Sequence, residues 1–369
     1  MKRIAILYGG KSGEHEVSQT SAAYVIRNLD PTRFEPVLVG IAKDGTWYLQ
    51  DPALVAKVRE GLTPIPVARG ARVFAAPSGG TAGGLVFESA AGVSALACEA
   101  VFPVLHGTFG EDGTIQGLLE TADLPYVGAP VLGSALGMDK EKAKALWLRA
   151  GLPVVPYRLV RASELDGPET DAALASELGM RFGWPLFVKP ACAGSSVGAS
   201  KVTAPATLGA ALREALRWDE KALVEPFVEA REIECSVLGN GKPVAYVPGE
   251  VLPTHEFYDY DAKYLDPRGA SLEIPARLTP EETSRVRKIA VAAYSALELA
   301  GMARVDFFLD KRTGEILLNE VNTIPGFTSI SMYPKMCEAG GLPYSELLSR
   351  LVELALERHA ARAKLVFAR

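Results

Sequence analysis

The chain has 369 residues, of which 48% are hydrophobic and 22% are charged, and its formal net charge is −5. This composition is typical of a globular protein with two or three domains, and the acidic balance gives no sign of the basic face that nucleic-acid-binding proteins carry. The four cysteines lie far apart with no C-x-x-C pair, so they indicate buried free thiols rather than a zinc site or a disulfide framework.

The chain opens with an apolar strand at residues 4–8. No signal-peptide segment accompanies it, and no apolar stretch of the sequence is long enough to span a bilayer. We therefore expect a cytoplasmic protein with neither a membrane nor a nucleic acid as partner.

A glycine-rich turn at residues 9–18 follows this strand and leads into a helical run that ends near Leu29. Strand, glycine turn and helix in this order open a doubly wound α/β unit. The glycines form neither G-x-G-x-x-G nor a P-loop, so the turn either presents Glu14 and helix-end N–H groups to a ligand or serves geometry alone. Residues 34–41 predict a second strand, and residues 51–95 predict strands and loops with no chemistry.

A buried strand at residues 100–105 ends in a loop, residues 106–113, that contains His106, three glycines and two acids. Ligands of open α/β sheets bind beyond the carboxyl ends of the strands. The position of His106 therefore favours a binding loop over a structural histidine. A short helix at 114–122 and a strand at 125–128 are expected next.

The character of the sequence changes near Gly137, where a helix begins at Met138 and is stopped by Gly151 and Pro153. We place a domain boundary there. A strand at 185–190 contains Lys189 and precedes a small-residue loop at 193–198. Such a loop offers N–H groups and hydroxyls to phosphate oxygens, although a flexible hairpin has the same composition.

The strand at 223–228 carries one acid, Glu225, and is typical of a hinge at which an adenine could lie between apolar residues. Strands at 233–238 and 243–250 follow. The polar, aromatic segment 255–264 predicts a mobile loop that closes over a site. Thr279, Pro280 and Glu282 then start a helix whose apolar stripe belongs to the core.

Two apolar runs, residues 303–309 and 315–321, flank a polar turn and predict a β-hairpin. If the register sets Asp306 opposite Glu320, then Arg304 lies opposite Asn322 on the same face. These oxygen ligands would suit Mg²⁺, whereas the alternative is an ordinary solvated strand face. A final amphipathic helix is expected at 343–363.

These segments together resemble the D-alanine–D-alanine ligase family of the ATP-grasp superfamily. The resemblance covers nearly the whole chain and rests on seven motifs in order, at residues 9–18, 105–113, 138–140, 189–198, 257–264, 304–306 and 319–329. It implies an α/β (α+β) fold of three domains. These are an N-terminal, doubly wound, parallel-sheet domain (1–137), a central ATP-grasp lid (138–226) and a C-terminal ATP-grasp domain with the metal and catalytic residues (227–369).

The resemblance also implies ATP-dependent synthesis of D-alanyl-D-alanine for peptidoglycan through an acyl phosphate, with two Mg²⁺ or Mn²⁺ ions on Asp306, Glu320 and Asn322. The residues expected around ATP are Lys140, Lys189, Ser195, Ser196, Glu225, Phe227, Val228, Glu232, Phe257 and Asn319. Arg304 and the Gly326 N–H would stabilise the oxyanion. Glu14 would bind the first D-alanine near His106, Lys263 and Ser331 would bind the second, and Ser195, Tyr264 and Glu14 would link the loop to the first domain.

Several alternatives stay open at this point. A D-alanine–D-lactate ligase, or another ATP-grasp ligase, would share the ATP and metal residues. A dinucleotide-binding oxidoreductase is disfavoured because G-x-G-x-x-G is absent, and a non-catalytic nucleotide-binding regulator would not need Arg304. Cys192 is expected to be a loop spacer rather than a reactive thiol, and the resemblance implies a homodimer.

Overall fold

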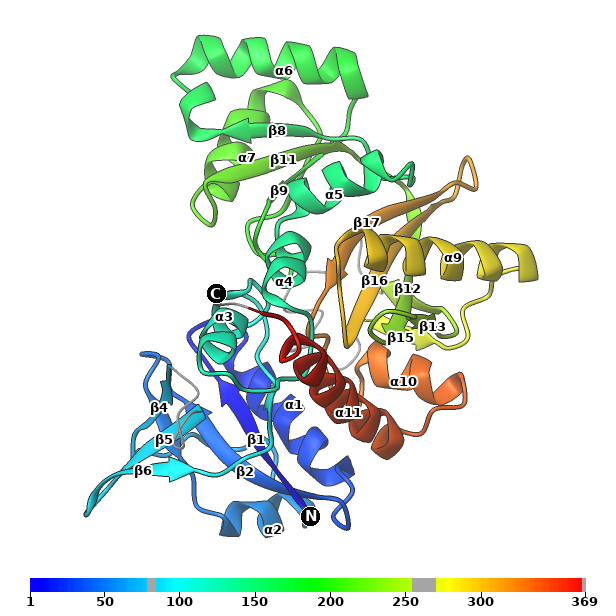
Figure 1. The fold of residues 1–369 in the computed structure, drawn as a ribbon. Coiled ribbons are helices and arrows are strands. Elements are labelled where there is room, and N and C mark those ends of the chain that lie inside the picture. Colours follow the sequence, from blue (N-terminus) through cyan, green and yellow to red (C-terminus); the bar gives the residue numbers. More distant parts are fainter. Residues whose placement is uncertain (78–83, 254–269, 367–369) are drawn as a thin grey trace.

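The computed structural model describes residues 1–77, 84–253 and 270–366. Figure 1 shows three groups of strands around a common centre. The N-terminal sheet contains β1 (Lys2–Gly9), β2 (Phe34–Ile41), β3 (Trp47–Leu49) and β7 (Ala100–Pro103), in the order β3-β2-β1-β7. Both β2 and β7 run parallel to β1, and β3 is an antiparallel edge.

Both faces of the N-terminal sheet are covered, as expected for a doubly wound unit. Ile4, Ile6 and Tyr8 pack on the side of α1 (His15–Asn28), whereas Ala5 and Leu7 pack on the side of α3 (Thr114–Thr121). The loops after β1 and β7 thus leave the sheet where the chain order reverses. This is the position at which such sheets bind ligands.

The segment between β3 and β7 is only partly as predicted. It forms α2 (Ala53–Arg59) and a small antiparallel sheet of β4 (Val73–Ala76), β5 (Gly84–Ser89) and β6 (Gly92–Leu96). The helix was not expected. The prediction of a strand at 125–128 is wrong, because this segment forms only an isolated parallel bridge between Tyr126 and Val101.

Two helices connect the N-terminal sheet to the rest of the chain, α4 (Val131–Met138) and α5 (Lys140–Arg149). The sequence predicted one helix from Met138. The carboxylate of Asp139 accepts hydrogen bonds from the backbone N–H groups of Glu141 and Lys142, so Asp139 caps α5 and separates it from α4.

The central sheet is antiparallel, in the order β10-β9-β11-β8, with β8 (Arg158–Arg161), β9 (Leu186–Pro190), β10 (Ser200–Val202) and β11 (Lys221–Pro226). The helices α6 (Pro168–Phe182) and α7 (Leu208–Ala215) pack on one side of it. Short 3₁₀ turns precede each helix, at Ala162–Glu164 and Pro205–Thr207.

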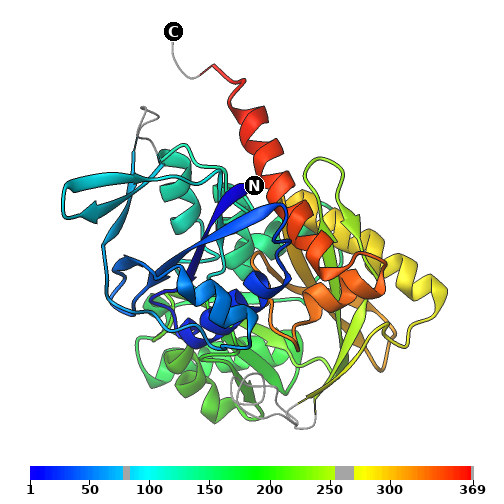
Figure 2. The same ribbon diagram turned by 90° about the horizontal axis from the view of Figure 1, so that it is seen from below.

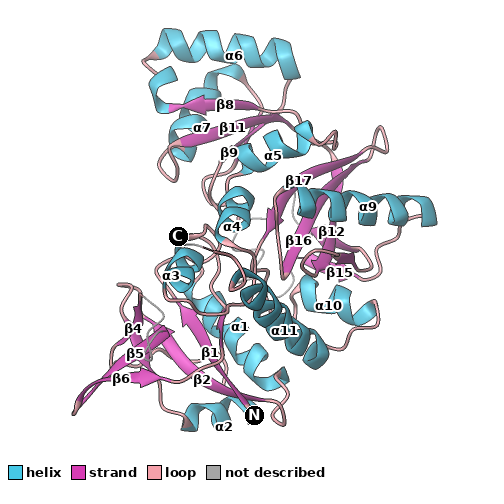
Figure 3. Cartoon of the chain, in the orientation of Figure 1, coloured by secondary structure: helices cyan, strands magenta, loops and turns pink. Residues whose placement is uncertain are grey.

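The C-terminal sheet has the order β15-β14-β12-β16-β17, with β13 paired to β12. Its strands are β12 (Ala230–Leu238), β13 (Val244–Ala245), β14 (Gly249–Pro253), β15 (Ala270–Glu273), β16 (Met302–Asp310) and β17 (Ile316–Asn322). The helix α9 (Pro280–Ala296) covers one face and begins with the predicted capping box between Thr279 and Glu282. The opposite face is shared between the site and residues 332–336, since Met332 and Met336 pack on Val251 and Ser236 Oγ donates to the Tyr333 carbonyl at 3.0 Å. Figure 3 shows α9 beside this sheet.

The last helices are α10 (Met332–Ala339), which was not predicted, and α11 (Tyr344–Arg362). Leu347, Leu351 and Val352 of α11 share one apolar core with β1 and α1 at the opposite end of the sequence (Figure 2). Within the described residues, no helix is both long and apolar enough to cross a membrane. The domain boundaries at 137/138 and 226/227 stay a prediction.

Candidate functional site

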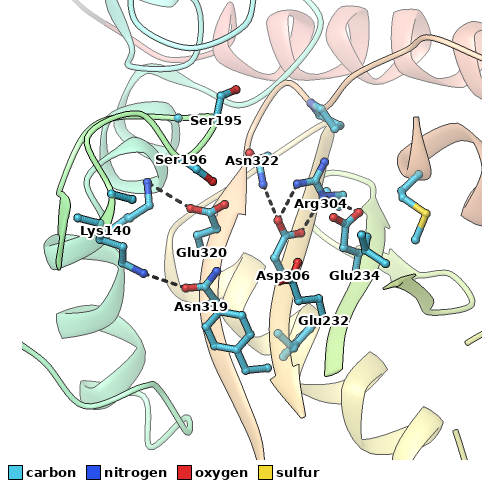
Figure 4. Close-up of a pocket in the computed structure, with 18 of the residues that line it drawn as sticks. Lys140, Ser195, Ser196, Glu232, Glu234, Arg304, Asp306, Asn319, Glu320 and Asn322 are labelled. Carbon is cyan, nitrogen blue, oxygen red and sulfur yellow. Dashed lines mark hydrogen bonds and ion pairs between the residues drawn. The ribbon is translucent and has the colours of Figure 1, made fainter. Parts of the chain in front are cut away.

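A cavity of about 710 Å³ lies where the three main sheets meet. This volume is within the range of small-molecule sites. Its walls come from the loops after β1 and β7, from β9 and β11, and from the face of β12, β16 and β17 that α9 leaves uncovered. Figure 4 shows the polar side chains that converge there.

The β16–β17 hairpin has the predicted register, with Asp306 opposite Glu320 and Arg304 opposite Asn322. A β-bulge follows Asp306, because Phe307 pairs with Leu318 and leaves Asn319 as an extra residue on β17. A bulge lets two consecutive side chains point to one face. Leu318 and Val321 therefore face the core, whereas Asn319 and Glu320 both face the cavity.

Arg304 is held by carboxylates on both sides. Its Nε and Nη2 donate to Asp306 Oδ1 and Oδ2 at 2.8 and 2.6 Å, and Nε lies 2.9 Å from Glu234 Oε2 on β12. Burial disfavours the cation, but Asp306 and Glu234 outweigh it and raise the pKa of Arg304 well above its usual value. The guanidinium is thus a fixed positive charge on the cavity floor.

Two lysines enter the cavity from the opposite wall. Lys140 Nζ lies 3.2 Å from Glu320 Oε2 and donates to the Ala193 carbonyl at 2.7 Å. Lys189 Nζ donates to Asn319 Oδ1 at 2.9 Å and lies 2.9 Å from Glu225 Oε2. The bulge is what brings Asn319 within reach of Lys189.

The loop predicted to hold phosphate has an unusual backbone. Ser195 and Ser196 both have positive φ, of 52° and 59°, a region that side chains other than glycine rarely adopt. Strain of this kind persists where the surroundings hold the loop. One contact that holds this loop is the hydrogen bond from Ser195 Oγ to Glu14 Oε1, at 2.7 Å. It joins the loop after β9 to the N-terminal glycine turn.

Glu14 lies between Ser195 and the loop that contains His106 and Gly107. A Cβ on Gly107, whose φ is +70°, would lie 2.4 Å from Glu14 Oε2. Only glycine lets the backbone approach the carboxylate this closely. Glu14 is therefore placed between two loops at the cavity wall.

Residues of the N-terminal unit hold the turn that follows β17 (residues 324–327) by its backbone. Ile324 donates its N–H to Glu111 Oε1 at 2.8 Å, and its carbonyl lies 3.0 Å from His106 Nδ1. Because a carbonyl only accepts, Nδ1 carries the proton and Nε2 accepts from Ser21 Oγ at 2.9 Å. Burial lowers the pKa of His106, consistent with a neutral ring.

Glu111 and Ser21 complete this set of contacts, which we call the turn clamp (Ser21, His106 and Glu111). Glu111 Oε2 accepts the Gly107 N–H at 2.9 Å, and Ser21 Oγ accepts the Phe327 N–H at 3.4 Å. Burial, followed by the charge of Glu14, raises the pKa of Glu111 to about 7. The clamp holds backbone groups on both sides of Gly326.

The part of the cavity near β11 is more apolar. Glu225 is buried there, and Phe227, Val228 and Glu232 line the wall. Lys201 Nζ lies 4.1 Å from the centroid of the Phe227 ring. Burial disfavours the charged form of Glu225, but Lys144 and Lys189 together outweigh it and hold its pKa below the usual value.

Ser331 lies beside the Gly326 turn. Its Oγ accepts the Thr328 N–H at 3.0 Å and lies 2.9 Å from Thr328 Oγ1. A Cβ on Gly326 would lie 2.7 Å from the Ser331 hydroxyl. A residue larger than glycine at position 326 would therefore displace either the turn or this hydroxyl.

The structure brings most of the predicted site residues to this cavity. Phe257, Lys263 and Tyr264 lie outside the described residues. Sequence reasoning assigned no role to Ser21, Glu111, Lys144 and Glu234, although Lys144 stands out as a lysine one helical turn after Lys140. Cys192 is not among the residues that line the cavity, and its backbone N–H donates to Asp219 Oδ2 at 2.7 Å. Burial, followed by Asp219, raises the pKa of the Cys192 thiol to about 12, which fits the expected spacer.

The predicted metal ligands provide oxygen donors alone. Asn322 Nδ2 donates to Asp306 Oδ2 at 2.9 Å, so the Asn322 Oδ1 is the atom that would serve as ligand. Across the described ranges, no group of three or more His, Cys, Asp or Glu side chains could hold a metal ion. Two carboxylates and an amide fit Mg²⁺ or Mn²⁺ that also takes oxygens from a substrate.

The comparisons with known proteins agree with this geometry. The family described as D-ala D-ala ligase N-terminus matches residues 3–129, and D-ala D-ala ligase C-terminus matches residues 146–353. The D-alanine–D-alanine ligase of Treponema denticola is 52% identical over 98% of this chain and 98% of its own length. The chain belongs to the D-alanine–D-alanine ligase family.

Two solved structures of similar ligases share the fold. The D-alanine–D-alanine ligase of Coxiella burnetii has a TM-score of 0.82 and 37% identity, covering 99% of this chain and 98% of its own. The VanG D-Ala:D-Ser ligase of Enterococcus faecalis has a TM-score of 0.81 and 35% identity, covering 96% and 99%. Family membership confirms the predicted ATP-grasp fold and the predicted ligase activity, and it does not favour the D-lactate alternative.

Proposed function

We propose that this D-alanine–D-alanine ligase makes D-alanyl-D-alanine in the 710 Å³ cavity, with ATP as the phosphoryl donor. A carboxylate oxygen of the first D-alanine attacks the γ-phosphorus, and the bond to ADP breaks. The amine of the second D-alanine then attacks the acyl carbon, loses a proton, and expels phosphate. The convergence of Lys140, Lys189, Arg304 and the β17 acids in one cavity is the observation that carries this proposal.

ATP would lie with its phosphates between the two lysines and the loop at Ser195 and Ser196. Phosphoryl transfer depends on positioning and on neutralising charge, and both lysines already contact acceptors across the cavity. Its adenine would lie beside Glu225, Phe227 and Val228, and its ribose near Glu232. Asn319 would orient Lys189, the contact that the bulge permits.

Asp306, Glu320 and Asn322 would hold the metal ions, for which the resemblance implies a count of two. Bound there, Mg²⁺ or Mn²⁺ would neutralise phosphate charge during transfer. Glu320 pairs with Lys140 in this structure, so Lys140 would shift from the carboxylate to a phosphate when the nucleotide binds.

Acyl transfer would take place at the Gly326 turn. Arg304 and the Gly326 N–H would donate to the oxygen that becomes negative, an arrangement that is often worth about 3–4 kcal/mol per donor. Glu14 would bind the ammonium of the first D-alanine. Ser331 would contact the carboxylate of the second, and His106 would support the turn, since both its ring nitrogens have protein partners.

The deciding experiment measures phosphate release from ATP with Mg²⁺ and D-alanine. Phosphate should be released with D-alanine and not with L-alanine. Adding D-lactate to D-alanine should yield no depsipeptide product. The same assay with D-alanine plus D-serine tests D-serine as acceptor, which is the second amino acid in the name of the VanG D-Ala:D-Ser ligase. Absence of D-alanine-dependent release would refute the proposal. The homodimer is proposed on the resemblance, and light scattering would test it. The cytoplasmic location is proposed on the composition and apolar pattern of the sequence.

A further inference from the structure

Lys144 is a fully buried lysine that the proposed reaction does not use. It lies on α5 one turn after Lys140, with 0% of its side chain exposed. Lysine is almost never fully buried unless it is paired. The Lys144 Nζ lies 2.9 Å from Glu225 Oε1 and 3.2 Å from its other partner, the carbonyl of Val155.

The carboxylate of Glu225 is shared between two cations. Lys144 approaches one oxygen, and Lys189 lies 2.9 Å from the other. Lys189 then continues to Asn319 at 2.9 Å. A continuous polar chain therefore runs from α5 through β11 and β9 to the bulge of β17, across the cavity.

The charge of this chain depends on Lys144. With both lysines protonated and Glu225 ionised, the buried group carries one net positive charge. Without Lys144, the carboxylate and Lys189 would neutralise each other, and Lys189 would have little net attraction left for an anion. Charges interact strongly where burial lowers the local dielectric constant, so this difference is not screened away.

Burial lowers the pKa of Lys144 to about 8, against the attraction of Glu225. The lysine therefore remains mostly protonated at neutral pH. Its neighbour on the helix, Lys142, is half exposed and pairs with Glu141 at 2.8 Å, away from the cavity.

We propose that Lys144 is a positioning residue for the nucleotide phosphates: it occupies one oxygen of Glu225, so that the charge of Lys189 remains available to a polyphosphate. The inference rests on the proposed ATP binding. It assigns Lys144 no contact with the substrate, and its effect passes through Glu225 and Lys189.

Calorimetric titration with ADP and with adenosine tests this role. Lys144→Met should weaken ADP binding roughly tenfold, since one unit of charge is lost next to the phosphates, and should change adenosine binding by less than about twofold. The KM for ATP should rise in parallel. Lys142→Met removes a lysine from the exposed face of the same helix and should leave both affinities unchanged.

A second variant separates charge from structure. Lys144→Met combined with Glu225→Gln leaves Lys189 with no carboxylate to neutralise it, so the ratio of ADP affinity to adenosine affinity should return to within about threefold of the wild-type ratio. The ratio cancels any loss of the proposed contact between Glu225 and the adenine, which ADP and adenosine share. This double variant has no buried carboxylate at position 225, so it provides a second test if Lys144→Met alone does not fold.

The outcomes distinguish the inference from the proposed function. If the wild type binds no ADP, the proposed function fails. If the wild type binds ADP and Lys144→Met binds it equally well, only the inference fails. Equal losses for ADP and adenosine in Lys144→Met, or a double variant whose ratio of ADP affinity to adenosine affinity stays about tenfold below the wild-type ratio, would also overturn it.

Discussion

Substitution of Ser21 by alanine would test whether the turn clamp positions the Gly326 N–H. Ser21 is completely buried on α1, and its hydroxyl joins His106 Nε2 to the Phe327 N–H. Alanine fits the helix and removes a single oxygen. The change therefore disconnects the turn from α1 without adding bulk or charge.

The expected cost follows from the groups that lose their partner. The His106 Nε2 acceptor and the Phe327 N–H donor would both remain buried, and each unsatisfied group costs about 1–3 kcal/mol. Because the Phe327 contact is long, at 3.4 Å, its share is at the low end. We expect a loss of about 2–4 kcal/mol of stability, and a melting temperature lower by on the order of 5 °C.

The effect on catalysis should exceed what stability alone explains. Removal of a whole oxyanion donor commonly costs about 100- to 1,000-fold in kcat, so a displaced donor should cost roughly tenfold. The assay is steady-state phosphate release at saturating D-alanine and ATP, at a temperature where the variant is fully folded by circular dichroism.

Ser18→Ala is the matched control, because Ser18 is equally buried on the same helix. Its hydroxyl accepts the Gly9 N–H at 2.8 Å and donates to the Val104 carbonyl, so its loss should cost similar stability. Its partners do not belong to the Gly326 turn, and its kcat should stay within about threefold of the wild type. If Ser21→Ala melts lower but keeps a wild-type kcat, the clamp does not position the turn.

Three further predictions concern Glu111, Glu320 and Cys192. Because burial raises the pKa of Glu111 from 4.5 to about 7, the folded state binds its proton more tightly than the unfolded state. Stability should therefore fall by up to about 3 kcal/mol as pH rises through that window, and urea titrations of Glu111→Gln should lack this slope. Glu320→Gln removes a proposed bridging charge between metal ions, so phosphate release should drop at least roughly 100-fold, and near-normal turnover would refute the two-metal assignment. Cys192→Ala should keep activity within about twofold, and alkylation at pH 8 should be slow, because the pKa of the thiol is raised to about 12 by burial; rapid labelling of Cys192 would contradict this.

The β16–β17 hairpin shows which features of the site could be predicted from the sequence and which could not. The sequence supports the pairing of Asp306 with Glu320 only as a condition, and the structure has this pairing. The regular register that pairs Phe307 with Leu318 would place Asp306 opposite Asn319, so the observed pairing depends on the bulge. The bulge at Asn319 was not predictable, since it depends on pairing with β16 and leaves no periodic signal. The role of Asn319 came from the resemblance, and only the structure explains how two consecutive side chains face the same cavity.

Long-range contacts account for the other omissions. Ser21 lies in an ordinary helical run, and nothing local indicates that it contacts a turn 306 residues later. Helix α4 was missed because its sequence, rich in glycine and small residues, has a poor intrinsic preference for helix, and burial against the C-terminal core overrides that preference. Glu111 was noted only as an acid in a glycine loop, since its burial depends on two distant segments.

The position of α11 has a consequence for how the chain is made. Leu347, Leu351 and Val352 complete the same core as Ile4 and Ile6, so the first strand meets its partner only after residues up to Val352 have been made. Domains usually fold in order as they emerge from the ribosome. Here the N-terminal unit should keep an open apolar face during synthesis and close it only once α11 has emerged. A nascent chain stalled before Tyr344 should therefore be protease-sensitive near α1, whereas the central sheet should already be protected.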